Sequence, residues 1–228
     1  MKGMLMSNIG LAVRQYGMVR VLRFLLADLR GRGLYNSQFQ QTKSIFIHVP
    51  KIAGSSIAKA LYGVEQGHYP CFLFEAISQR KFKESFKFGF VRNPWDRVVS
   101  AYHYLAQGGK IEADRTWARA HLAGVRDFSD FVRNRLICPL VRESIHFRSQ
   151  TYFLCDHTGR IAVDFLGRFE SLDRDFQVVA DKVKPGARIR QSNSSSHNDF
   201  RTYYEADTRD LVGRIYGEEI AKFRYTFD

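Results

Sequence analysis

Two apolar segments in this sequence are each followed by a tight loop and then by helix-forming residues. Residues 44–49 (SIFIHV) are rich in β-branched and aromatic side chains, and they lead through residues 50–56 (PKIAGSS) into a helical stretch. Residues 86–91 (FKFGFV) form a second such run, which ends at the turn residues Asn93 and Pro94. Strands that alternate with helices usually pair in parallel. The sequence therefore predicts an α/β, P-loop-like three-layer fold with a central parallel β-sheet flanked by helices.

The segment after the second run has the signals of a helix start. Asn93 is a preferred N-cap, Pro94 suits the first helical position, and Asp96 complements the positive end of the helix dipole. We expect this helix to run to about residue 105. The later pattern predicts a mainly helical region over 111–150, a strand over 161–165 that either continues to or is followed by a short strand at 169–172, a helix over about 173–183, a loop over 186–198 and a last helix over about 208–223.

The N-terminal residues 9–29 are rich in apolar side chains, but arginines interrupt them. No uninterrupted apolar run reaches the ~20 residues that span a bilayer, and no small-residue cleavage site follows. One helical face gathers Met18, Val21, Leu22, Leu25 and Leu29. This amphipathic helix either packs on the rest of the chain, which we favour, or lies on an anionic membrane. Together with a polar linker over 31–43, it forms an N-terminal region, 1–43, that precedes one domain over 44–228.

The chain is strongly basic. Its 228 residues include 35 Lys and Arg against 23 Asp and Glu, a formal net charge of +12. Such a charge favours a nucleic acid, an anionic membrane or a phosphorylated or sulfated ligand. No zinc-finger, RNA-stacking or basic-zipper pattern is present, which argues against a nucleic-acid partner. The three cysteines, Cys71, Cys138 and Cys155, are widely spaced, so they indicate neither a disulfide framework nor a zinc site and favour a reducing compartment.

The loop at 50–56 has the composition of a phosphate-binding turn. Gly54 lets the backbone approach an anion closely, Ser55 and Ser56 supply hydroxyls, and the start of the next helix supplies N–H groups. Lys51 adds a mobile positive charge. The lysine precedes the glycine, unlike in the Walker sequence of nucleotide triphosphatases. A simple strand-to-helix turn is the alternative interpretation.

A second anion site is predicted at the end of the next strand. Arg92 supplies charge and a planar fork that suits phosphate, and Ser100 lies on a face of the following helix from which its hydroxyl reaches the same anion. A structural ion pair with Asp96 is the alternative, which we prefer for Arg97 but not for Arg92. Two phosphate sites after successive strands imply a ligand with two separated phosphates, such as a 3′,5′-bisphosphorylated nucleoside.

The segments HVPKIAGSSI and FVRNPWDRVVSAY, in this order, resemble the sulfotransferase superfamily that uses 3′-phosphoadenosine 5′-phosphosulfate (PAPS) as sulfuryl donor. The better match is its carbohydrate branch, which includes membrane-associated and bacterial enzymes. The later segments FRSQTYFL, IAVDFLGRFESLDRDF and NSSSHNDFRTYYEADTRDLV agree, and the resemblance covers residues 44–228. One departure is Ile52, where relatives often carry a threonine whose hydroxyl contacts phosphate.

The resemblance implies which residues bind the donor. The 5′-phosphosulfate would be held by Lys51, Ala53, Gly54, Ser55 and Ser56, and the 3′-phosphate by Arg92 and Ser100. Phe169 would lie near the adenine. A late loop that contains Ser195 and Arg201 would close over the 3′-phosphate. This scheme requires no metal.

Sulfuryl transfer is an in-line displacement in which charge grows on the leaving phosphate oxygen, so catalysis consists mostly of positioning and charge stabilisation. We expect Lys51 to stabilise that oxygen. The acceptor hydroxyl needs a base, for which His68, between the two motifs, is favoured over His103. Glu75 is a carboxylate alternative, and His48 is expected to be packed in the fold.

The sequence thus predicts an enzyme that moves a sulfuryl group from PAPS to a hydroxyl of a carbohydrate or another acceptor. Two alternatives stay open, a nucleotide kinase with an atypical loop and a non-catalytic module that binds polyanions. A kinase would prefer ATP with Mg²⁺ to an adenosine bisphosphate. The size of the chain and the lack of a signal or anchor in it are typical of a bacterial cytoplasmic enzyme, whose N-terminal helix offers a route to peripheral membrane contact.

Overall fold

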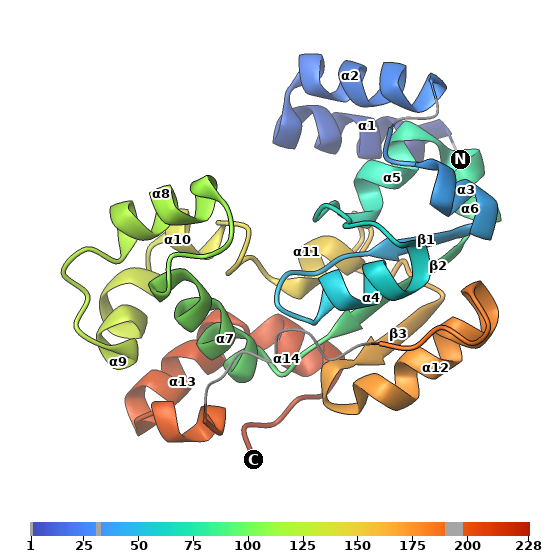
Figure 1. The fold of residues 1–228 in the computed structure, drawn as a ribbon. Coiled ribbons are helices and arrows are strands. Elements are labelled where there is room, and N and C mark those ends of the chain that lie inside the picture. The colour runs from blue at the N-terminus through green and yellow to red at the C-terminus, as the bar shows by residue number, and fades with distance from the viewer. Residues whose placement is uncertain (1, 31–32, 190–197) are drawn as a thin grey trace. The chain divides into compact units, whose positions relative to one another are not determined.

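The computed structural model describes residues 2–30, 33–189 and 198–228, with side chains from residue 8 onward (Figure 1). The chain divides into two compact units. Unit 1 comprises Met1–Val49, Gly54–Val91 and Gln150–Arg190, and unit 2 comprises Pro50–Ala53, Arg92–Ser149 and Gln191–Asp228. The predicted division into an N-terminal region, 1–43, and a following domain stays a prediction.

Unit 1 contains a parallel sheet of three strands in the order β1 (Ser44–Ile47), β2 (Phe86–Val91) and β3 (Phe165–Arg168). All four residues of β1 are buried, as expected for a strand covered on both faces. Phe46 is in register with Phe88, and their rings stack with centroids 5.2 Å apart. The sheet confirms the predicted α/β fold and the strand that was expected at 86–91.

Helices flank this sheet in two groups (Figure 1). In the first group, α4 (Gly54–Tyr62) follows β1 and packs against α12 (Leu172–Val183), which also packs on β3. In the second group, α5 (Cys71–Ile77) packs on α1 (Lys2–Tyr16), α2 (Met18–Leu29) and α11 (Gln150–Leu154). Unit 1 also contains α3 (Ser37–Thr42), α6 (Gln79–Glu84) and the 3₁₀ helix η2 (Phe169–Ser171).

The N-terminal apolar segment forms two helices rather than one. Gly17, between α1 and α2, has φ of 78°, a left-handed conformation that glycine adopts at little cost. The predicted linker over 31–43 contains α3, and Tyr35 and Phe39 beside or within this helix are buried. The linker prediction missed these contacts because polar neighbours separate the two aromatic residues in the sequence.

The predicted strand at 161–165 is wrong, and so is the short strand at 169–172. Ile161 forms only an isolated bridge with Cys155, because Asp156 closes a tight turn by accepting hydrogen bonds from Thr158 N (2.8 Å) and Arg160 N (3.1 Å). The strand β3 begins where the chain reaches β2, and η2 follows it directly.

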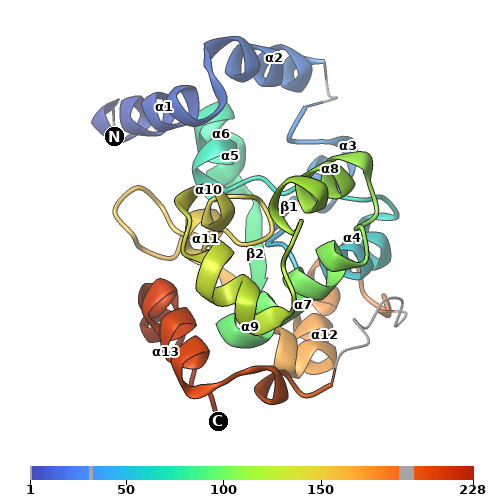
Figure 2. The same ribbon diagram turned by 90° about the vertical axis from the view of Figure 1, so that its left-hand side faces the viewer.

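Unit 2 is built around α7 (Pro94–Ala106), which begins as predicted: the Asn93 side chain accepts a hydrogen bond from Trp95 N (3.1 Å). Both α8 (Glu112–His121) and α13 (Ala206–Ile215) pack on α7 (Figure 2). Unit 2 also contains α9 (Phe128–Phe131), the π-helix η1 (Val132–Leu136), α10 (Pro139–Arg142), the 3₁₀ helix η3 (Phe200–Tyr203) and α14 (Gly217–Phe223). Its apolar core includes Trp95, Val99, Leu105, Phe131, Phe147 and Val212.

The last predicted helix, 208–223, is two helices in the structure. Tyr216 leaves the helical conformation (φ −107°, ψ 19°), and its hydroxyl donates a hydrogen bond to the Phe147 carbonyl oxygen (2.7 Å). This buried hydrogen bond stabilises the break between α13 and α14. Its contribution exceeds the few tenths of a kcal/mol by which the local residues would favour one continuous helix. Within the described ranges of the chain, every helix is too short or too polar to span a bilayer.

The start of α4 is packed against a buried histidine. His48 is 5% exposed and stacks on Phe46, as the sequence led us to expect for a packed side chain. A Cβ atom at Gly54 would lie 2.0 Å from two atoms of the His48 ring. Gly54 is therefore required by close packing inside unit 1, whatever else it contacts.

We predict that Gly54→Ala lowers the free energy of unfolding by about 1–3 kcal/mol, because the added methyl group overlaps the His48 ring. Gly10→Ala is the matched control. Position 10 is helical and a Cβ there meets no atom within 4 Å, so alanine should raise the stability by about 0.5–1 kcal/mol. Urea unfolding measures both, and equal effects of the two substitutions would contradict the packing assignment.

Candidate functional site

The loop Pro50–Ala53 has an unusual backbone. Lys51 and Ala53 have positive φ values, 71° and 62°, which residues with a Cβ atom adopt at a cost of about 1–3 kcal/mol each. Between them, the side chain of Ile52 is fully buried. Such strain persists only where surrounding contacts impose it, and it is frequent in ligand-binding loops.

Arg92 supplies one of these contacts. Its Nη1 donates a hydrogen bond to the Lys51 carbonyl oxygen (3.1 Å). Its Nε and Nη2 donate to the two carboxylate oxygens of Asp96, at 2.7 and 2.8 Å. The structure therefore brings together Lys51 and Arg92, which the sequence assigned to two anion sites. The ion pair with Asp96, considered above as the alternative role of Arg92, is present.

The ammonium group of Lys51 lies over an aromatic ring. Its Nζ is 3.9 Å from the centroid of Tyr104, and within residues 2–30, 33–189 and 198–228 it forms no ion pair. Burial, together with the positive charges of Arg92 and Lys110, lowers the pKa of Lys51 to about 7. A partly desolvated cation of this kind gains more from a bound anion than a solvated lysine does.

Tyr104 belongs to a hydrogen-bonded network that the sequence did not indicate. Its hydroxyl donates to the carboxylate of Asp114, which also accepts from His146 Nε2 (2.9 Å). Burial works to raise the pKa of Asp114, but the bonds from Tyr104 and His146 outweigh it and hold this pKa below its usual range. Burial lowers the pKa of His146, so the neutral ring carries its proton on Nε2. Burial and the bond to Asp114 raise the pKa of Tyr104 to about 12.

A buried ion pair supports this network from the other side. Arg97 donates to the His146 carbonyl oxygen (3.2 Å) and pairs with Glu219 (3.5 Å), and both charged side chains are almost completely buried. Ser149 Oγ donates to the second oxygen of Glu219 (2.7 Å). The structural role predicted for Arg97 is therefore present, but its partner is Glu219, because Arg92 occupies Asp96.

Unit 1 contains other residues that the sequence assigned to donor binding or catalysis. Ser55 and Ser56 lie in the first turn of α4, and Phe169 begins η2. His68 Nδ1 is 2.9 Å from the His48 carbonyl oxygen, so the neutral ring donates from Nδ1 and leaves Nε2 unprotonated. Burial, followed by the neighbouring His68, lowers the pKa of His48 to about 3, so His48 stays neutral.

The other predicted residues of unit 2 that the structure describes lie on α7 and η3. Ser100 is buried on α7, and Arg201 is an exposed residue of η3 that pairs with Asp199 (3.1 Å). His103, the second choice of base, packs on Tyr203 with ring centroids 4.8 Å apart.

Two further predictions concern Glu75 and Ser195. Glu75, the carboxylate alternative, is buried on α5 and accepts a hydrogen bond from Asn8 Nδ2 (2.8 Å). This bond gives it a structural partner in α1. Ser195 lies outside the described residues.

Replacing Lys51 by methionine is expected to stabilise the folded protein at neutral and acidic pH. The pKa of Lys51 is about 7 in the fold against an ordinary 10.5, so between these pH values the unfolded chain binds a proton that the folded chain does not. The resulting destabilisation is absent above pH 10.5, grows as the pH falls, and is complete below about 7.

Thermal unfolding across this pH range measures the effect. The gain in Tm for Lys51→Met should widen as the pH falls, whereas Lys59→Met, at an exposed position on α4, should show no such trend. A pH-independent difference between Lys51→Met and the unmodified protein contradicts the assignment.

Comparison with known proteins gives one match. The searches of curated proteins and of solved structures returned none. A model of the sulfotransferase family matches residues 39–226, which include the loop at Lys51, the strand end at Arg92 and the network around Tyr104. This match covers most of the chain and confirms the resemblance inferred from the two motifs. The chain therefore belongs to the sulfotransferase family.

Proposed function

We propose that this protein transfers a sulfuryl group from PAPS to a hydroxyl group of a carbohydrate. Membership of the sulfotransferase family supports sulfuryl transfer in general. The observation that carries the proposal further is the Lys51 ammonium, which is partly buried on Tyr104 in a strained loop tied to Arg92. The carbohydrate acceptor rests on the resemblance to the carbohydrate branch.

The donor carries several anionic oxygens, and each unit, taken by itself, contains residues of a kind that binds such oxygens. In unit 2, Lys51 has a pKa lowered by burial and by two neighbouring cations, an environment that an anion relieves. In unit 1, Ser55 and Ser56 present hydroxyls and N–H groups in the first turn of α4, where the helix dipole is positive. When bound, PAPS supplies an activated sulfuryl group attached to phosphate.

Lys51 is the residue we assign to charge stabilisation. Transfer leaves negative charge on the phosphate oxygen, and an ammonium already held in place stabilises that charge without reorganisation. Tyr104 holds the ammonium, and Asp114 with His146 fixes the Tyr104 hydroxyl. These three residues act as positioning residues in the proposal.

His68 is the residue we assign to the acceptor hydroxyl. The bond between its Nδ1 and the His48 carbonyl oxygen orients the ring and selects the tautomer whose Nε2 accepts a proton. His48 is itself locked by its Nδ1 bond to the Gln66 carbonyl oxygen (2.7 Å). The ring of His68 is thus supported by a rigid neighbour.

Donor binding is tested with adenosine 3′,5′-bisphosphate, the product that PAPS leaves behind. We expect it to raise the Tm of the protein more than ATP with Mg²⁺ does. Arg92→Ala should weaken its binding by about 10- to 100-fold, because one charge-assisted contact and the tie to the loop are lost. Arg214→Ala removes the same charge from α13 and should bind normally. Stronger stabilisation by ATP with Mg²⁺ would favour a kinase.

Transfer is tested with radiolabelled sulfate in PAPS and a panel of glycans. Lys51→Ala should reduce the transfer rate by about 10²- to 10³-fold, the usual effect of removing one preorganised stabilising group, and should weaken donor binding less. Lys59→Ala, on the exposed part of α4, is the control and should transfer normally. Full activity of Lys51→Ala refutes its role, and labelling of no glycan refutes the carbohydrate acceptor.

Proton uptake gives an independent test of Lys51. The free lysine has a pKa of about 7, and a bound anion raises it, so binding of adenosine bisphosphate at mildly alkaline pH should take up close to one proton. Affinity should fall as the pH rises above about 7. Titration calorimetry in buffers of different ionisation enthalpy measures this uptake, and Lys51→Met should abolish it. Unchanged uptake in Lys51→Met assigns the proton to another group.

A further inference from the structure

The helix α2 exposes a continuous apolar stripe. Five of its side chains are between 48% and 83% exposed: Met18, Val19, Leu22, Leu26 and Leu29. At 100° per residue they cover roughly 100° of the helix circumference, so they form one band along the helix. This band differs from the face expected from the sequence, because Val21 is buried and Leu25 is partly buried.

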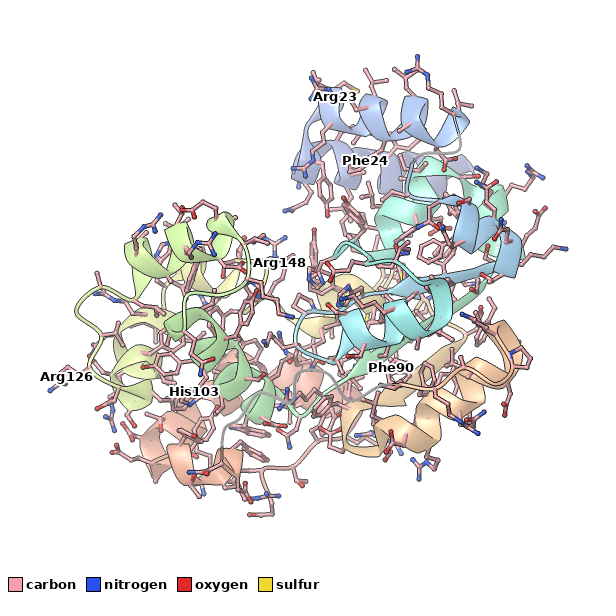
Figure 3. The ribbon with its side chains drawn as sticks, viewed as in Figure 1. Arg23, Phe24, Phe90, His103, Arg126 and Arg148 are labelled. Carbon is pink, nitrogen blue, oxygen red and sulfur yellow. The ribbon has the colours of Figure 1, made fainter. Side chains whose placement is uncertain are left out.

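The opposite side of α2 anchors the helix to unit 1. Val21 is 3% exposed, and Phe24 packs edge-on against Tyr69 with centroids 5.5 Å apart. Phe24 points from α2 toward the body of the unit (Figure 3). Asp28 pairs with Lys81 (2.7 Å) and accepts a hydrogen bond from Tyr35 N (3.2 Å). With this side occupied, the apolar stripe stays on the outside.

The charges around the stripe are of one sign. Arg23 is exposed beside the stripe, Arg20 is exposed farther round the helix, and Arg30 caps the helix at its C-terminal end. Asp28 is the single acidic residue within Met18–Leu29, and Lys81 neutralises it on the anchored side. The exposed surface of α2 is therefore apolar and cationic.

We propose that α2 docks on an anionic lipid bilayer, with the apolar stripe at the boundary of the acyl chains and the arginines among the headgroups. An exposed aliphatic band bordered by arginine is the pattern of helices that lie in a membrane interface. A second copy of this chain fits less well, because Arg20 and Arg23 of two copies would meet across the contact. The inference does not depend on the proposed enzymatic function.

Flotation of the full chain with vesicles tests the proposal. We expect binding to vesicles of equal parts phosphatidylcholine and phosphatidylglycerol, weak binding to phosphatidylcholine alone, and partial loss at high salt. The double substitution Leu22→Glu with Leu26→Glu should lower the partition coefficient at least ~10-fold. Arg20→Glu with Arg23→Glu should lower it on anionic vesicles by a similar factor.

Matched controls separate docking from unfolding. Val178→Glu places the same group on an exposed apolar position of α12, and Arg214→Glu makes the same charge change on α13, so both variants should bind vesicles normally. All variants should keep the Tm of the unmodified protein, since the changed residues are exposed. Vesicle binding that survives Leu22→Glu with Leu26→Glu overturns the proposal. So does a dimer in light scattering that this variant dissociates, which assigns the stripe to self-association.

Discussion

The hydrogen bond from Arg92 to the Lys51 carbonyl oxygen is the constraint on which the candidate site depends. The loop Pro50–Ala53 contains two residues in left-handed conformations, and neither is a glycine. Local sequence alone does not favour that backbone. The guanidinium fixes the carbonyl from outside the loop, and Asp96 fixes the guanidinium by two further bonds. Lys51 thereby receives its position from a residue that follows the next strand.

The buried charged groups around this loop differ in how well neighbouring groups compensate their charge. Arg97 and Glu219 are deeply buried but form an ion pair, and Ser149 donates a hydrogen bond to the other carboxylate oxygen of Glu219. The Asp114 carboxylate accepts hydrogen bonds from both Tyr104 and His146. Lys51 has an aromatic face in place of a carboxylate, so its charge is the least compensated among these groups. Unfavourable burial of a cation in the free protein favours a state in which negative charge is present beside it.

The parts of the fold that could be predicted are those with strong local signals. Two features could be predicted from the sequence, the strand at 86–91 and the start of α7 at Asn93-Pro94. Strand composition and helix capping both act within a few residues. The strand expected at 161–165 failed because pairing with β2 decides where β3 begins, and the break at Tyr216 depends on a bond to Phe147. Both are long-range effects.

The candidate site shows the same division. Lys51 and Arg92 were identified because each follows a predicted strand, and parallel strands bring their ends to one edge. Tyr104, Asp114 and His146 carry no motif, since ten and thirty-two residues separate the bonded pairs. These three side chains meet because of how α7, α8 and the chain near Phe147 pack against one another. No periodicity in the sequence encodes that packing.

Gly17 has a consequence for the shape of the N-terminus. A residue with a side chain at this position favours right-handed helical angles, and α1 and α2 would then tend to merge into one rod, residues 2–29, about 42 Å long. Such a rod could not place Phe24 on Tyr69 and Asp28 on Lys81 while α1 still packs on α5. One missing methyl group therefore determines that the chain begins as a folded-back hairpin and not as a projecting arm.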